Sequence, residues 1–138
     1  MANLHVDIVA AEGHIYSGEA TMVFAPASQG EVGIAPRHAP LLTTLKPGTV
    51  RVQNGSEEHA FFVAGGILEI QPHLVSVLAD TALRSKDIDE AAAAKAKADA
   101  EAKLAGAKTE MDLKHAQQEL IEAAARLEFV KKIQKTSR

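Results

Sequence analysis

The stretch TVRVQNGSEEHAFFVAGGILEIQPHLVSVLAD, residues 49–80, decides the fold class. It contains four short segments rich in β-branched and aromatic residues, and turn residues end each of them. Asn54-Gly55 is a strong hairpin signal, because a tight two-residue turn requires positive φ angles. Gly65-Gly66 and Pro72-His73 separate the segments that follow. Strands at this spacing, with no helix between them, predict an antiparallel meander.

The same pattern continues towards the N-terminus. Residues 4–10, LHVDIVA, alternate, with Leu4, Val6 and Ile8 on one face and His5, Asp7 and Val9 on the other. ATMVFAP (residues 20–26) and LLTTL (residues 41–45) also have the composition of strands. Residues 1–84 therefore predict an antiparallel β-sandwich, or flattened barrel.

The composition changes sharply after Asp80. Asp87 is placed as a helix N-cap with Glu90 three residues later, and half of the residues from 88 to 105 are Ala. Gly106 ends this helix, and a second helix begins at Thr109. Its apolar residues at heptad spacing are Leu113, Ala116, Leu120, Ala123, Leu127 and Val130. Residues 85–138 thus predict an antiparallel two-helix hairpin, which makes the chain an α+β protein of two domains.

The first helix offers little area for docking. Its large apolar residues are Ile88 and Leu104, so the rest of its interface is made of methyl groups. Alanine keeps a segment helical without help from a partner, so a weakly docked helix that changes position is one interpretation. A static hairpin, in which Ala permits close packing, is the other.

Several classes of function are disfavoured by what the sequence lacks. There is no Cys, no G-x-S-x-G nucleophile motif and no phosphate-binding loop, and the six His residues do not have the spacing of metal ligands. We therefore predict no catalytic residue and no metal site. No segment resembles a signal peptide or a span of about 20 apolar residues, so we expect a cytoplasmic protein that reaches a membrane only through a partner.

Two surfaces are candidates for binding. Gly and Pro residues in GEVGIAPRHAPLL, residues 30–42, predict a stiff turn that presents Glu31, Arg37 and His38. The C-terminal residues form a basic tip on an acidic chain: Arg126, Lys131, Lys132, Lys135 and Arg138. Nucleic acid is a poor partner for it, because the remaining surface repels phosphate. An acidic protein partner and a simple solvated helix end both remain open.

The order GEVGIAPRHAPLL, KPGTVRV and FFVAGGILEIQPHLVSVLADTA, followed by the helix start Asp-Ile-Asp-Glu, resembles the epsilon subunit of the bacterial F-type ATP synthase. The resemblance implies a non-catalytic subunit of the central rotor stalk, peripheral at the cytoplasmic face of the inner membrane. It also implies that the sandwich binds the gamma subunit and the c-ring, which Glu31, Arg37 and His38 would approach. The hairpin would extend between gamma and the catalytic head and restrain ATP hydrolysis, with the basic tip against the beta and alpha subunits.

Some relatives in that family bind ATP through an I/L-D-x-x-R-A motif on the first hairpin helix. The matching residues are 88–93, IDEAAA, where Ala92 occupies the position of the Arg. Asp89 and Arg126 remain as possible contacts, but Glu122 would repel phosphate. A missing guanidinium removes a contact of about 1.5–3 kcal/mol, so we expect weak or absent ATP binding and no cofactor. A nucleotide sensor and a sandwich hydrolase are the disfavoured alternatives.

Overall fold

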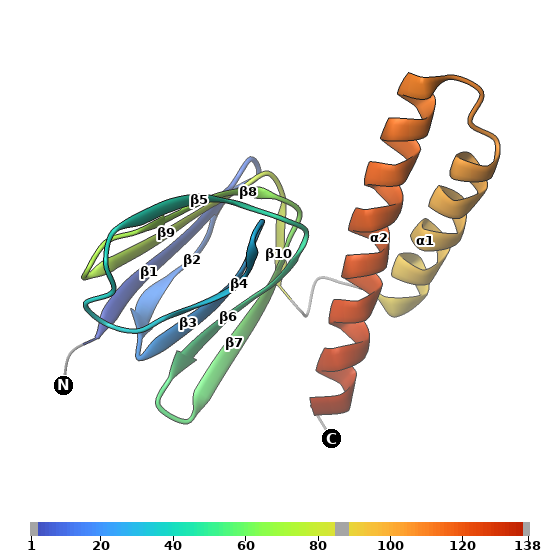
Figure 1. Cartoon of the computed structure of the whole chain (residues 1–138). Coiled ribbons are helices and arrows are strands. Elements are labelled where there is room, and N and C mark those ends of the chain that lie inside the picture. The colour runs from blue at the N-terminus through green and yellow to red at the C-terminus, as the bar shows by residue number, and fades with distance from the viewer. Residues whose placement is uncertain (1–2, 85–88, 137–138) are drawn as a thin grey trace. The chain divides into compact units, whose positions relative to one another are not determined.

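The computed structural model describes residues 3–84 and 89–136, with side chains up to residue 132 (Figure 1). These residues fall into two compact units, divided after Arg84. The first unit contains the strands β1 (Leu4–Ala10), β2 (Gly13–Ala20), β3 (Met22–Ala27), β4 (Gly30–Ile34), β5 (Leu41–Leu45), β6 (Gly48–Asn54), β7 (Glu57–Val63), β8 (Gly66–Ile70), β9 (Leu74–Ala79) and β10 (Ala82–Arg84). The second contains the helices α1 (Glu90–Ala105) and α2 (Glu110–Thr136). The predicted sandwich followed by a two-helix hairpin is confirmed.

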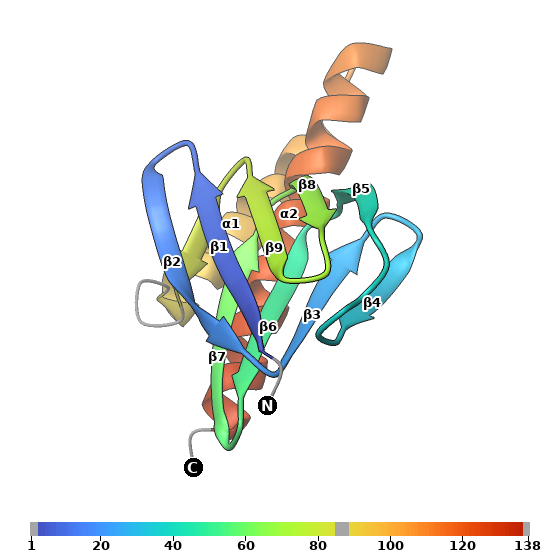
Figure 2. The same cartoon turned by 90° about the vertical axis from the view of Figure 1, so that its left-hand side faces the viewer.

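The strands form one sheet that folds over into two layers. Its order is β10-β7-β6-β3-β5-β8-β9-β1-β2, with β4 paired to the free side of β3. Figure 2 shows β2, β1, β9, β8 and β5 following one another across one layer. The layers are joined at the single pair Ala27 and Leu45. On the opposite side, the Arg84 guanidinium donates a hydrogen bond to the Ile15 carbonyl, so β10 and β2 nearly close the barrel.

The core between the layers follows from the alternation of each strand. In β1, Leu4, Val6 and Ile8 are fully buried, whereas the residues between them are half-buried. The core cluster lies within residues 4–82: Leu4, Val6, Ile8, Ala10, Ala20, Val23, Ala25, Ile34, Leu45, Val50, Val52, Phe61, Val63, Leu68, Ile70, Val75, Val77, Ala79 and Ala82. Among the described residues, no polar or charged residue is buried. Apolar packing therefore holds the sandwich together.

Three strands were not predicted: β2, β4 and β10. The segment of β4 was interpreted as a turn because it begins with Gly30 and contains Gly33, but it pairs along its length with β3. Gly33 lies opposite Phe24, and a Cβ at Gly33 would lie 3.3 Å from the Phe24 ring. The aromatic ring occupies the space over the glycine, and this packing outweighs the low strand propensity of Gly.

Two details of pairing also differ from prediction. The hairpin between β6 and β7 is confirmed, but its turn is centred on Gly55-Ser56, because Asn54 still pairs with Glu57. Gly55 alone supplies the positive φ, at +64°. In addition, β1 and β9 pair in parallel, in a sheet predicted to be antiparallel. Turn signals report local connections and carry no information about which distant strand the first strand joins.

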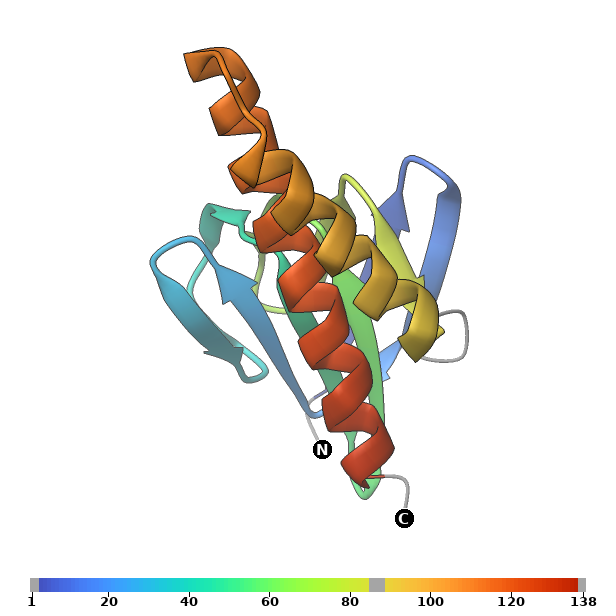
Figure 3. The same ribbon diagram turned by 90° about the vertical axis from the view of Figure 1, so that its right-hand side faces the viewer.

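The second unit is an antiparallel hairpin (Figure 3). Helix α1 begins at Glu90, and its N-cap is Asp89, whose Oδ1 accepts a hydrogen bond from the Ala91 N–H at 3.0 Å. The prediction of Asp87 as the N-cap is wrong, and Asp87 itself lies outside the described residues. Gly106 ends α1 as predicted. The predicted start of α2 is also confirmed, because Thr109 Oγ1 accepts from the Asp112 N–H at 3.0 Å.

The helices meet through alanines, as expected. The buried residues of α1 are Ala93 and Ala100, each 3% exposed, and Leu104 is only half-buried. Ile88 lies outside the described residues. Buried residues of α2 include Ala116, Ala123, Leu127 and Val130. Leu113, the first residue of the heptad series, is 40% exposed beside the connecting loop. The ion pair between Lys103 Nζ and Glu119 Oε2, at 3.1 Å, links the helices at their surface.

Candidate interaction surfaces

Backbone hydrogen bonds hold the turn after β4. Arg37 has a φ of +68°, a left-handed conformation that is unusual for a residue with a side chain. Its N–H donates to the Pro72 carbonyl at 2.9 Å, and the His38 N–H donates to the Ala35 carbonyl at 3.2 Å. The His38 ring is fixed as well, because Nδ1 donates to the Ala39 carbonyl at 2.7 Å. Arg37 and His38 thus project from a turn that two backbone hydrogen bonds hold in place.

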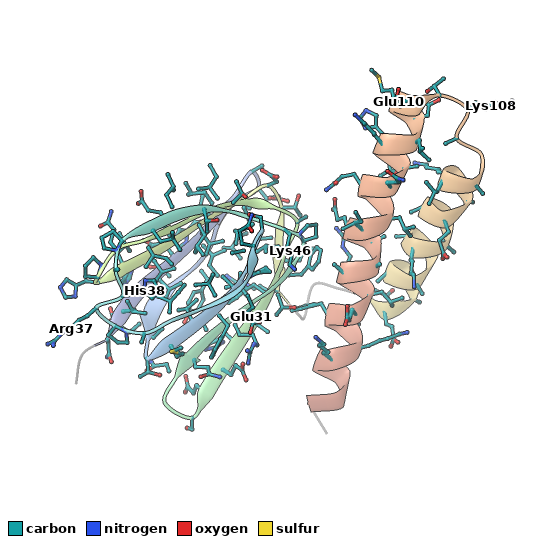
Figure 4. The ribbon with its side chains drawn as sticks, viewed as in Figure 1. Glu31, Arg37, His38, Lys46, Lys108 and Glu110 are labelled. Carbon is teal, nitrogen blue, oxygen red and sulfur yellow. The ribbon has the colours of Figure 1, made fainter. Side chains whose placement is uncertain are left out.

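Glu31 does not belong to this turn. It lies in β4, paired with Pro26, and Figure 4 shows it well apart from Arg37 and His38. Its carboxylate is 3.7 Å from the Arg51 guanidinium, which also approaches Glu58 at 3.4 Å and lies 4.2 Å above the Phe24 ring. The prediction that one loop presents all three residues is therefore wrong for Glu31, because pairing with β3 draws the first residues of the stretch into the sheet.

An apolar patch on the sandwich was missed by sequence analysis. Leu42 in β5, Ile67 in β8 and Leu78 in β9 are 67%, 44% and 50% exposed. The register places Ile67 opposite Leu78, and Leu42 opposite Glu69, the next outward residue of β8. The sequence did contain a sign of this patch. In the predicted strands, the alternation of inward and outward residues assigns these three apolar side chains to the solvent side. Three large apolar side chains on neighbouring strands form a surface suited to a protein partner.

A polar group adjoins the apolar patch on the same outer face, the solvent side of β5, β8, β9, β1 and β2. We call it the His5 cluster: His5, Asp7, Ser17 and Glu19. His5 Nε2 lies 3.0 Å from Asp7 Oδ1, and His5 Nδ1 lies 3.3 Å from Glu19 Oε1. The Ser17 hydroxyl donates to Asp7 Oδ1 at 2.8 Å. The sequence could not reveal this cluster, because β2 was not predicted and it supplies Ser17 and Glu19.

These contacts shift the pKa of two groups. The hydrogen bond to the Glu19 carboxylate raises the pKa of His5, and Asp7 adds to this effect against a smaller opposing effect of burial. The hydrogen bond from the Ser17 hydroxyl lowers the pKa of Asp7, and the His5 imidazole adds to it. The imidazole of His5 is therefore held between two carboxylates that favour its protonated form.

The described part of the basic tip lies on the longer helix of the hairpin. Helix α2 has 27 residues and α1 has 16, so α2 is longer than α1 by roughly 16 Å. Arg126 Nη2 lies 3.5 Å from Glu122, and Lys132 Nζ lies 3.8 Å from Glu128. Lys131 is exposed. The side chain of Lys135 and the whole of Arg138 lie outside the described residues.

The residues considered for nucleotide binding have other roles here. The Asp89 carboxylate caps α1, and Ala92 is exposed. A shallow groove of about 180 Å³ between the helices is lined by Ala96, Ala100, Glu119, Glu122, Ala123 and Arg126. Two carboxylates and one guanidinium make this groove a poor site for a triphosphate.

Within residues 3–84 and 89–136, no group of three or more His, Asp or Glu side chains is arranged to hold a metal ion. Neither of the two helices found there has a stretch that is long and apolar enough to cross a membrane.

Comparison with known families accounts for both units. Residues 3–85 match the ATP synthase delta/epsilon chain β-sandwich domain, and residues 86–131 match the long α-helix domain of the same chain. The ATP synthase epsilon chain of Alkalilimnicola ehrlichii is 55% identical and is aligned over 100% of this chain and 99% of its own length. The epsilon chain of Halorhodospira halophila is 54% identical with the same coverage.

Two solved structures have the same fold. A chain of the Euglena gracilis mitochondrial ATP synthase, in a structure of OSCP, F1 and c-ring, aligns with a TM-score of 0.80 at 20% identity, over 91% of this chain and 79% of that one. A chain from the central stalk and c-ring of the Tetrahymena thermophila mitochondrial ATP synthase aligns with a TM-score of 0.65 at 12% identity, over 92% and 96%.

The resemblance inferred from the sequence is confirmed by these matches, because they cover the sandwich and the hairpin together. The expectation of a subunit without catalytic function is confirmed by the same relatives, which are all epsilon chains. The chain belongs to the epsilon-chain family of the bacterial ATP synthases.

Proposed function

We propose that this chain is the central-stalk subunit that couples the catalytic head of the ATP synthase to its c-ring, peripheral at the cytoplasmic face of the bacterial inner membrane. The sandwich binds the gamma subunit through the apolar patch, and it contacts the c-ring through Arg37 and His38, with Glu31 on the neighbouring strand. The hairpin restrains ATP hydrolysis, with the basic tip against the beta and alpha subunits.

The observation that carries the docking role is the apolar patch. Leu42, Ile67 and Leu78 are exposed on three adjacent strands, on the face of the sheet opposite to the buried core. Covering such side chains yields roughly 25 cal/mol for each Å² removed from water. A sheet whose backbone is already ordered loses less conformational entropy on binding than a flexible segment, so a smaller part of this gain is offset.

The contact with the ring is supported by the backbone of the Arg37 turn. Its hydrogen bonds to Pro72 and Ala35 fix the direction of the two side chains before a partner arrives. Preformed geometry lowers the entropic cost of binding. Glu31 lies on a different element, so its contribution is separable from that of Arg37 and His38 by mutation.

The inhibitory role is supported by the construction of the hairpin. Both helices have their own N-caps, at Asp89 and Thr109, and the buried residues of α1 are alanines. Because α1 contributes mainly methyl groups to the interface, its separation from α2 exposes little of its own apolar area, which favours a change of position. The described cations of α2 provide charge complementary to an acidic surface.

The docking role is tested with Leu78→Lys, which places a charge in the apolar patch. Binding of the full chain to the purified gamma subunit should weaken at least tenfold. Ser56→Lys adds the same charge at the exposed β6–β7 turn and should bind like the wild type. Equal affinities for the two variants would contradict docking through the apolar patch.

The inhibitory role is tested by ATP hydrolysis of the assembled complex, with the full chain and with a chain ending at Lys86, at matched occupancy. Truncation should raise hydrolysis while proton-driven synthesis continues. Unchanged rates would show that the hairpin is a passive element, and only the coupling role of the sandwich would remain.

A further inference from the structure

The His5 cluster lies on the face that the proposed function assigns to docking. Parallel pairing of β1 with β9 places Val9 beside Leu78 of the apolar patch and Asp7 beside Ser76. Antiparallel pairing with β2 places Glu19 opposite His5 and Ser17 opposite Asp7. A partner that covers Leu78 therefore reaches the charged edge of the same face within one or two strands.

The charge of this edge depends on the imidazole of His5, with a second imidazole, His14, at its margin. Asp7 on β1 and Glu19 on β2 face His5 directly, and His14 on β2 approaches Asp7 at 4.0 Å. From β9 the facing residues are Leu74 and Ser76, which carry no charge, and Glu69 on β8 lies beyond Ser76. With His5 neutral, Asp7 and Glu19 present two negative charges, and protonation of His5 reduces this to one.

We propose that the His5 cluster makes docking on the outer face dependent on pH. When His5 is neutral, Asp7 and Glu19 pair with a basic side chain of the gamma subunit. Protonated His5 satisfies the same two carboxylates from within the chain, and the partner's cation is then opposed by a like charge. This inference rests on the proposed docking through the apolar patch and adds to it a titrating contact.

His5 and Asp7 also contribute to the stability of the sandwich, and these contributions depend on pH. The folded-state pKa of His5 is raised, so its stabilising contribution is fully present below pH 6.5 and is lost as pH rises through the folded value. The pKa of Asp7 is lowered, so its contribution is present above pH 3.8 and is lost as pH falls through the folded value. Between about pH 5 and pH 6.5 both contributions favour the folded sandwich. Weaker docking in that range therefore does not come from a loss of these two contributions to stability.

The test is the affinity of the full chain for the purified gamma subunit between about pH 5.5 and pH 8.5. For the wild type we expect a dissociation constant two- to fivefold larger at the acid end, the size of effect typical of one partly exposed ion pair. His5→Gln keeps a donor but does not titrate, and its affinity should change much less. His59→Gln removes an imidazole that lies 3.9 Å from the Glu57 carboxylate on β7 and should retain the wild-type pH profile.

A second measurement tests whether the pH profile of binding follows the titration of the His5 imidazole. NMR titration of the His5 ring in the free chain should give a midpoint above that of an exposed histidine, and the midpoint of the binding profile should follow it. An identical pH profile for the wild type and His5→Gln would overturn this inference and leave docking itself intact. Absence of binding at every pH would instead overturn the docking on which the inference rests.

Discussion

Arg37 has a left-handed backbone conformation in a turn bounded by Pro36 and Pro40. A side chain in this region costs roughly 1–2 kcal/mol, which glycine avoids. The turn keeps this conformation because the Arg37 N–H bonds to Pro72 and the His38 N–H bonds to Ala35. A strained residue that is fixed from both sides, with an exposed guanidinium, is what a binding turn would be expected to contain.

Substitutions of Arg37 should affect the stability of the chain and its binding to the c-ring independently. Arg37→Gly should be more stable to urea than Arg37→Ala by about 1 kcal/mol. Both variants lack the guanidinium, but only alanine has a Cβ atom, which is strained in the left-handed conformation. Both variants should bind a purified c-ring equally weakly. If Arg37→Gly bound the ring as tightly as the wild type, the guanidinium would have no role in that contact.

At the scale of the element, the sequence predicted what local signals specify. Gly106 ended α1, Thr109 began α2, and the alternation of residues 4–10 assigned Leu4, Val6 and Ile8 to the core. It did not predict β2 or β4, because their pairing with distant segments outweighs weak local propensity. The His5 cluster was missed for the same reason, since Glu19 becomes a neighbour of His5 only through the register of β1 and β2.

The alanine interface between α1 and α2 gives a prediction about packing. Ala100→Leu adds volume at a site that is 3% exposed and should destabilise the hairpin by about 1–3 kcal/mol. Hydrogen exchange of the α1 amides in the full chain should then accelerate. Ala98→Leu makes the same change on the exposed side of α1 and serves as the control. Equal exchange rates in the two variants would mean that the interface tolerates added volume and is not closely packed.

Helix α1 also gives a prediction about nucleotide. Calorimetry of the full chain should detect no binding at micromolar ATP, because position 92 lacks a guanidinium and Glu119 and Glu122 line the nearby groove. Ala92→Arg should increase the affinity, and Ala92→Gln, similar in length but uncharged, should not. Micromolar binding by the wild type would revive the nucleotide sensor as a candidate function.

At the scale of the whole molecule, the decisive feature is that the sandwich has a complete core of its own. Every member of the core cluster lies between Leu4 and Ala82. A chain that ends at Lys86 should therefore fold cooperatively and keep its affinity for the gamma subunit. Deletion of β9 should abolish both, because β9 joins β1 to β8. Loss of gamma binding by the truncated chain would show that the sandwich alone is not the docking unit.

The closure of the barrel at Arg84 has a mechanical consequence. Strand β10 is three residues long, pairs with β7 alone, and ends at the residue whose guanidinium holds the Ile15 carbonyl. A force that pulls on the chain after Arg84 therefore acts first on the pairing of β10 with β7 and on the hydrogen bond between Arg84 and Ile15. The longer strands are affected only after these contacts break. We therefore expect this seam to open under a pulling force before the apolar core is disturbed.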